Sequence, residues 1–241
     1  MSRTRLLRRA GAASLLAALV LGSAGCSVPD LNGDDEASPK ATTTASATPK
    51  TYESQFTKDG TFQSHINIAN VDFVYTLYPT KSTPRTNEWY PKGKKYFSFT
   101  FQSYDLDRRL RDPFRSKRHV YVDHISVSSA VRTTDGGTND EHPYTLDAVA
   151  KKVTFDPEPV TTEHGMLATS PKGAFELRNQ AIEPTADDTF GIDLTFTATV
   201  WMERRAGSDS YVKKVVKQRV PIAIFPSDTP TQKQRIPVDA N

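Results

Sequence analysis

The stretch FGIDLTFTATVWM, Phe190 to Met202, decides the fold of this chain. Apolar residues occupy every second position from Ile192 to Met202, and mostly threonine stands between them. Successive side chains of a β-strand point to opposite faces, so this spacing predicts a strand with one face in a core. The turn sequence AGSD, residues 206–209, and a Val- and Ile-rich run to Phe225 follow, and together they predict a long hairpin.

The same alternation predicts further strands upstream. It is clearest over residues 71–78, where Phe73, Tyr75 and Leu77 share a face, and over residues 96–103. Weaker patterns predict strands over residues 62–68, 144–146, 152–155 and 174–179.

Two local features constrain how the strands pair. Apolar residues at 120 and 122 share one parity, whereas those at 125, 127 and 131 share the other, and this change predicts a β-bulge near Asp123 and His124. Pro221 has no N–H to donate to a neighbouring strand. The second strand of the hairpin is therefore expected to lie at a sheet edge or to change partners near Pro221.

Helical spacing is nearly absent, apart from residues 146–153, where one or two helical turns fit the pattern. Several short strands separated by Gly and Pro turns are typical of a β-sandwich. We therefore predict an all-β fold, an antiparallel immunoglobulin-like β-sandwich of about seven to nine strands. The single cysteine excludes a Cys-Trp-Cys arrangement, so any likeness to antibody domains is one of architecture.

The N-terminal residues have the pattern of an export signal. Four arginines stand within the first nine residues, and residues 10–21 follow as twelve small or apolar residues without a charge. That run is short for a helix that must cross about 30 Å of hydrocarbon, so it predicts a signal peptide. Arg8 and Arg9 leave twin-arginine export open beside general secretion, which we favour because no bulky apolar residue follows them directly.

The segment Ser23-Ala24-Gly25-Cys26 resembles the lipobox of bacterial lipoprotein signal peptides. The resemblance implies that the sulfur of Cys26 carries a diacylglyceryl group and that cleavage makes Cys26 the new N-terminus. Two acyl chains anchor a protein stably, whereas one would be marginal. The expected location is the outer face of a bacterial plasma membrane. An ordinary secretory signal with a chance cysteine is the alternative.

Composition divides the chain into four parts. Residues 1–25 form the predicted lipoprotein signal peptide, and residues 26–51, rich in Ser, Thr, Ala and Pro, form a predicted disordered tether. Ser27 to Lys50 could reach about 80 Å if fully stretched. The predicted β-sandwich domain covers residues 52–226, and residues 227–241 form a polar C-terminal tail.

A second resemblance lies near the start of the domain. The stretch YPKGKKYFSFTFQSYD, Tyr90 to Asp105, comes after the lipobox and the tether. This arrangement resembles the telokin-like, immunoglobulin-fold extracellular domains of Gram-positive lipoproteins, in which a Lys-Gly turn leads into an alternating strand. The resemblance implies binding or accessory work at the cell surface, and it carries over no site residue.

The charge of the chain argues against a nucleic-acid partner. The formal net charge is +3, but four arginines and no acidic residue precede Cys26. The processed chain would therefore hold 27 basic and 28 acidic residues. A nearly neutral chain leaves electrostatic recognition to local clusters. The lone cysteine also excludes an intramolecular disulfide.

The densest local cluster is DLDRRLRDPFRSKRH, Asp105 to His119. Six cations stand there against three aspartates, between two predicted strands, so we expect an exposed basic loop. Guanidinium groups suit carboxylate and phosphate oxygens, which makes this loop the candidate anion-binding site. A solvated loop with internal Asp–Arg pairs is the alternative. The candidate residues are Arg108, Arg109, Arg111, Arg115, Lys117 and Arg118.

Other patterns point less clearly to a site. TTDGGTNDEH, Thr133 to His142, gathers oxygen ligands without the spacing of a calcium loop, so we expect a solvated hairpin connection. The five histidines are scattered singly, and no metal site is expected. Trp89, Tyr90 and Trp201 could form a ligand platform, although a second packing layer is the simpler interpretation.

The motifs of common enzyme classes do not occur with supporting partners, so we expect neither enzymatic activity nor a cofactor. The sequence predicts a lipid-anchored binding or assembly module. Its expected partners are the membrane, through the anchor on Cys26, and an anionic cell-wall polymer or another envelope protein. An accessory or solute-binding component of an envelope transporter is the alternative function, and a hydrolase is less favoured.

Overall fold

The computed structural model describes residues 52–80, 88–93, 95–135 and 141–226, which belong to one compact unit, residues 47–241. Cys26 and the predicted signal peptide, tether and C-terminal tail lie outside the described residues. The helices are α1 (Gln55–Asp59), α2 (Ala150–Val153) and the 3-10 turn η1 (Phe114–Ser116). None of the described helices is long and apolar enough to span a bilayer.

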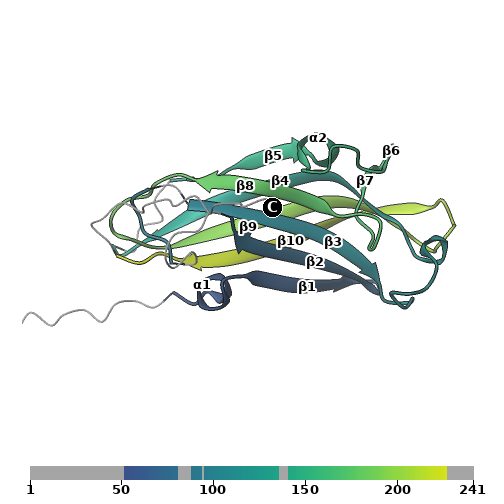
Figure 1. Ribbon diagram of the computed structural model, residues 1–241, viewed down its shortest axis with the longest axis horizontal. Coiled ribbons are helices and arrows are strands. Elements are labelled where there is room, and N and C mark those ends of the chain that lie inside the picture. Colours follow the sequence, from purple (N-terminus) through teal and green to yellow (C-terminus); the bar gives the residue numbers. More distant parts are fainter. Residues whose placement is uncertain (1–51, 81–87, 94, 136–140, 227–241) are drawn as a thin grey trace, which may run out of the picture. The chain divides into compact units, whose positions relative to one another are not determined.

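The described strands form two antiparallel sheets, one in front of the other (Figure 1). The first has the order β1-β2-β3-β8, with β1 (Phe62–Ile68), β2 (Val71–Pro79), β3 (Lys95–Asp105) and β8 (Phe175–Ile182). The second has the order β10-β9-β4-β7-β6, and β5 also pairs with β4. Its strands are β4 (Val120–Thr133), β5 (Leu146–Val149), β6 (Thr161–Thr162), β7 (Gly165–Leu167), β9 (Thr189–Glu203) and β10 (Tyr211–Ala223).

The alternating stretch Phe190 to Met202 lies within β9, and the apolar face of this strand fills the space between the sheets. Phe196 lies 4.7 Å from the ring of Phe99 and 5.9 Å from that of Tyr75, both from the first sheet. Such edge-on and tilted contacts are the arrangements that aromatic pairs prefer. The predicted antiparallel β-sandwich is therefore confirmed.

The two pairing predictions are also confirmed. The register of β4 against β9 shifts between Val122 and His124, where the change of parity predicted a bulge. β10 lies at the edge of the second sheet, where a proline, which has no N–H to donate, is tolerated.

Some elements differ from the sequence-based prediction. The described residues form ten strands, because β6 and β7 are too short to show alternation. The strand predicted over residues 152–155 is wrong: helix α2 ends there, and the segment then turns away as a loop. The strand order also differs from that of antibody constant domains. Here β2 pairs with β1 and β3, whereas in those domains the second strand pairs with the first and the fifth.

Gly165 allows the β6–β7 turn to lie directly on β4. Its φ is +117°, and a Cβ atom there would stand 2.2 Å from the carbonyl oxygen of Val122. Only glycine accepts this backbone conformation and this approach. The turn therefore brings His164 over Trp201, with ring centroids 4.9 Å apart.

The first described residue, Tyr52, is bound to the outer face of the second sheet. Its ring lies against the backbone of Gly191, where a Cβ would come within 2.8 Å of it, and its hydroxyl donates to Asp193. The same carboxylate accepts hydrogen bonds from Arg132, at 2.8 and 3.0 Å, and from Arg219, at 2.8 Å. Burial raises the pKa of Asp193, but these donors outweigh it and hold the pKa below its usual range.

Helix α1 follows Tyr52 and is fixed at both ends. Ser54 caps the helix by accepting from the N–H of Thr57, and its own hydroxyl donates to the carbonyl of Pro221 at 2.8 Å. Phe56 is buried against Trp89, with centroids 4.9 Å apart. The domain therefore begins at the end of the sandwich where β1 starts, opposite the β1–β2 turn (Figure 1).

Candidate functional site

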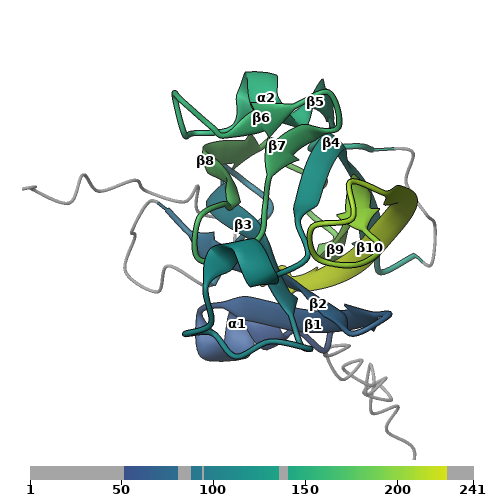
Figure 2. The same ribbon diagram turned by 90° about the vertical axis from the view of Figure 1, so that its right-hand side faces the viewer.

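The segment between β3 and β4, Leu106 to His119, forms a loop at the far end of the sandwich from α1; we call it the basic loop (Figures 1 and 2). It holds the six cations that the sequence analysis named, together with Asp107 and Asp112. Two of the six, Lys117 and Arg118, are buried. The other four are exposed: Arg108, Arg109, Arg111 and Arg115.

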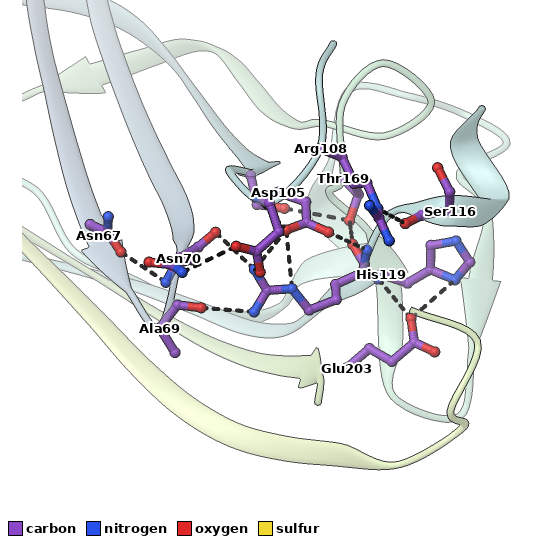
Figure 3. A network of polar contacts seen from close by, with 12 residues as sticks. Asn67, Ala69, Asn70, Asp105, Arg108, Ser116, His119, Thr169 and Glu203 are labelled. Atoms are coloured by element: carbon purple, nitrogen blue, oxygen red, sulfur yellow. Dashed lines mark hydrogen bonds and ion pairs between the residues drawn. The ribbon is translucent and has the colours of Figure 1, made fainter. Parts of the chain in front are cut away.

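A polar network at the base of the loop includes Asp105, Ala69 and Asn70 (Figure 3), and Arg118 is its centre. Its guanidinium donates to Asp105 at 2.6 and 3.1 Å and to Asp107 at 2.9 Å. It also donates to the carbonyls of Ala69, at 2.7 Å, and Asn70, at 2.8 Å, in the β1–β2 turn. With these donors in use, Arg118 ties the loop to the first sheet and has little left for a ligand.

Asp105, the last residue of β3, is the acidic partner in this network, and its side chain is only 2% exposed. It also accepts the backbone N–H groups of Arg118, at 2.8 Å, and Asp107, at 3.2 Å. Burial raises the pKa of Asp105, but the hydrogen bonds and the charge of Arg118 outweigh it, so the pKa lies below its usual range. The network is therefore held as an ion pair.

Lys117 supports the tip of the loop from inside and is only 3% exposed. Its ammonium donates to the carbonyls of Arg109 and Leu110, each at 2.9 Å. Burying an ammonium group costs free energy unless such donors are satisfied. Lys117 and Arg118 are thus structural, and the candidate anion-binding set narrows to the four exposed arginines.

The four exposed arginines form no ion pair within the part of the chain that the structure describes. Asp107 is bound by Arg118, and Asp112 accepts the backbone N–H of Arg109 at 2.9 Å. Among contacts with described residues, only Arg108 of these four makes a side-chain hydrogen bond, from Nε to the carbonyl of Ser116 at 3.0 Å. The predicted alternative of internal Asp–Arg pairs therefore applies at Arg118, whereas the exposed arginines keep donors for an outside anion.

Two leucines stand among these arginines. Leu106 is 52% exposed and Leu110 is 63% exposed, although both are large apolar residues. Sequence reasoning noted only the charges of this loop. The signal that could have found them is the presence of two leucines in the polar run DLDRRLRD, Asp105 to Asp112.

The β9–β10 turn lies beside the basic loop, and Glu203, which is only 1% exposed, connects the two. The carboxylate of Glu203 accepts the N–H of His119 at 3.0 Å (Figure 3), and it accepts that of Ser208 at 2.9 Å. Arg204 and Arg205 follow at the exposed turn. The basic surface therefore continues from the loop onto this hairpin.

A row of rings leads from the loop over the outer face of the second sheet. Phe114 stacks on His119 at 4.9 Å, and Tyr121 contacts Tyr211 at 5.8 Å. Burial raises the pKa of the Tyr211 hydroxyl to about 12. One face of Trp201 contacts His164, and the ammonium of Lys213 lies 5.4 Å from its ring. The rings cover one another, as a second packing layer would.

The other predicted platform residues lie elsewhere. Trp89 is only 4% exposed and packs in the core, and Tyr90 lies against Phe225. The structure therefore does not bring Trp89 and Trp201 together as one platform.

No group of three or more His, Cys, Asp or Glu side chains in the described part of the chain is placed to hold a metal ion. His65 pairs with Asp72 at 2.7 Å in the first sheet, and His124 pairs with Asp147 at 2.9 Å in the second. Half of the stretch considered for calcium, residues 136–140, lies outside the described residues.

A cavity of about 510 Å³ lies at the opposite end of the domain, next to α1. Its apolar lining includes Phe190, Ile224 and Phe225. Its described lining also holds three carboxylates and no histidine. The carboxylates are Glu53, Asp187 and Asp188.

Comparison with known proteins assigns no family to this chain. No family model matches it, and no curated protein matches it. Among solved structures, a copper-bound variant of FetP from uropathogenic Escherichia coli strain F11 is 7% identical, covers 73% of this chain and 99% of its own, and gives a TM-score of 0.26. Similarity at this level carries no argument about fold or function.

Proposed function

We propose that this protein is a lipid-anchored, non-enzymatic binding or assembly module at the outer face of a bacterial plasma membrane. The lipobox-like segment ending at Cys26 supports the anchor, and the tether that follows it supports a domain held away from its attachment point. The binding site is the basic loop, and its partner carries carboxylate or phosphate groups, as an anionic wall polymer or an acidic envelope protein does.

The observation that carries this proposal is the state of the four exposed arginines. Arg118 and Lys117 fix the backbone of the loop from within, while the exposed guanidinium groups have no carboxylate partner in the described residues. A loop backbone that is preorganised in this way loses little freedom on binding. The exposed guanidinium groups offer forked donors that match the oxygens of carboxylates and phosphates.

The cavity favours the second candidate, an accessory or solute-binding component of an envelope transporter. Its volume of about 510 Å³ falls within the range of small-molecule sites. A hydrolase is less favoured, although Glu53, Asp187 and Asp188 line the same cavity. Co-purification of a permease with the protein would support the transporter role over the polymer-binding one.

The anchor is tested at Cys26. Cells that make the full chain are grown with a labelled fatty acid, and we expect the label to enter the protein. In the Cys26→Ser variant the label should be absent, because the acyl chains need the sulfur. A known lipoprotein labelled in parallel is the control, and an unlabelled wild-type chain beside a labelled control would contradict the anchor.

The binding site is tested with Arg108, Arg109, Arg111 and Arg115 changed together to serine. Retention of the wild-type chain on purified cell wall should weaken as salt rises, and in the variant it should be lost. The matched control changes four exposed cations outside the loop to serine: Lys58, Lys151, Lys152 and Lys217. The control keeps its retention if position matters more than net charge, and equal loss in both variants would contradict a local site.

A further inference from the structure

We infer that the basic loop docks on the surface of an anionic lipid bilayer, an inference that rests on the proposal that this loop is the binding site. The observation is the placement of Leu106 and Leu110 among the exposed arginines. These leucines are 52% and 63% exposed. A surface that combines apolar side chains with cations matches the boundary between acyl chains and phosphate headgroups.

The position of Leu110 is fixed by the fold. Its carbonyl accepts from Lys117 at 2.9 Å, and the neighbouring turn is closed by the N–H of Asp112, which donates to the carbonyl of Arg109 at 3.0 Å. The buried ammonium of Lys117 thus holds the backbone of Leu110 while the side chain projects outward. Because the loop is already ordered, docking would cost little conformational entropy.

Charges around the loop extend the cationic surface. Arg204 and Arg205 lie on the adjacent turn, and Lys172 lies over the ring of Phe114 at 5.0 Å. Of the nearby carboxylates, Asp105 and Asp107 are bound by Arg118, Asp112 accepts the backbone N–H of Arg109, and Glu203 accepts those of His119 and Ser208. The loop therefore presents a cationic face to a negatively charged membrane surface.

The leucines favour a bilayer over a dissolved polymer. A hydrated anionic polymer can pair with the arginines, but it offers no apolar volume in which Leu106 and Leu110 lose their contact with water. The boundary region of a bilayer offers both at once.

The distances allow the loop and the acyl anchor to share one membrane. The longest strand, β9, has fifteen residues and spans about 50 Å. Ser27 to Lys50 can span up to about 80 Å. The chain between Cys26 and the domain is therefore long enough for the loop, at the far end of the sandwich from α1, to reach the bilayer that holds the anchor.

The test uses the mature chain with Cys26→Ser, so that neither the acyl chains nor the apolar signal segment can bind lipid. Its binding to vesicles of equal parts phosphatidylglycerol and phosphatidylcholine is measured by co-sedimentation, with pure phosphatidylcholine vesicles for comparison. We expect binding to the anionic vesicles only. Leu106→Ser with Leu110→Ser should weaken it by about tenfold, and the change of four arginines to serine by about a thousandfold.

The matched control for the leucines is Val160→Ser with Val215→Ser, which removes two exposed apolar residues outside the loop. This control should bind the anionic vesicles like the parent chain. Equal binding by the leucine variant and the parent would overturn the inference, as would failure of the parent chain to bind anionic vesicles while it is retained on cell wall. The binding site proposed above would survive both results. It fails only if the arginine variant keeps both its binding to anionic vesicles and its retention on cell wall.

A second measurement reports on the position of the loop itself. Because Cys26 is the only cysteine in the chain, the Cys26→Ser background accepts a single label at Leu110→Cys. A polarity-sensitive dye at this position should shift to shorter emission wavelength on anionic vesicles. The same dye at Val215→Cys should not shift, and the reverse pattern would place the contact elsewhere.

Discussion

Replacing Arg118 by methionine is expected to lower the free energy of unfolding by about 3–5 kcal/mol. The change would leave Asp105, with a side chain only 2% exposed, as a buried carboxylate without its cation. It would also remove the donors to the carbonyls of Ala69 and Asn70. Urea unfolding of both chains measures the effect.

The control for this prediction is Arg108→Met, which removes an exposed arginine from the same loop and should leave the stability nearly unchanged. A double-mutant cycle with Asp105→Asn isolates the pair, because two partners in contact should not have additive effects. If Arg118→Met proves as mild as Arg108→Met, the network does not hold the loop.

The same pair predicts how stability responds to acid. The pKa of Asp105 is lowered in the folded state from the ordinary 3.8, so the unfolded chain binds this proton at a higher pH than the folded chain. The stabilisation is present in full above the unfolded pKa and is lost as the pH falls through the folded pKa. The difference between wild type and Arg118→Met should therefore shrink below about pH 4.

The free energy of unfolding of the wild type, measured relative to that of a Lys95→Met variant, is expected to rise by about 3 kcal/mol as the pH rises from 8 to 10.5. Lys95 is only 2% exposed, and burial lowers the pKa of its ammonium to about 8. Its donations to the carbonyls of Pro91 and Gly93, each at 3.2 Å, satisfy the ammonium, and the charge of Glu183 offsets the effect of burial on the pKa only in part.

The sign follows from proton binding. Between the folded pKa of about 8 and the ordinary 10.5, the unfolded chain holds the proton of Lys95 and the folded chain does not, so stability from this group rises with pH. The variant lacks this group, whereas the tyrosines titrate in both chains and their effect cancels. Unfolding measured at several pH values gives the difference, and Lys151→Met, at an exposed position, is the control. Parallel curves for wild type and Lys95→Met would refute the prediction.

The fold could be predicted from sequence where one residue type repeats at a fixed spacing. The alternation in β9 predicted both the strand and its buried face, and the change of parity before His124 predicted the bulge in β4. Helix α1 was missed because it is only five residues long, although its Ser54 cap and Gly60 end are the usual signals.

The site could be predicted only as a stretch of charge. Within RSKRH, Arg115 to His119, neighbouring cations have the same chemistry, and only the fold separates the exposed Arg115 from the buried Arg118. What distinguishes them is the β1–β2 turn, whose carbonyls come from residues almost fifty positions away. A local sequence pattern cannot predict a contact between residues so far apart in the chain.

The docking of Tyr52 across Gly191 has a mechanical consequence. If the chain before it is tied to a membrane, any pull on the domain arrives first at the hydroxyl that donates to Asp193, in front of helix α1. Asp193 belongs to β9, which is hydrogen-bonded along its length to both β4 and β10, so the load is shared by three strands. Tyr52 would thus transfer the load to β9 and protect the contacts of α1 with the rest of the domain.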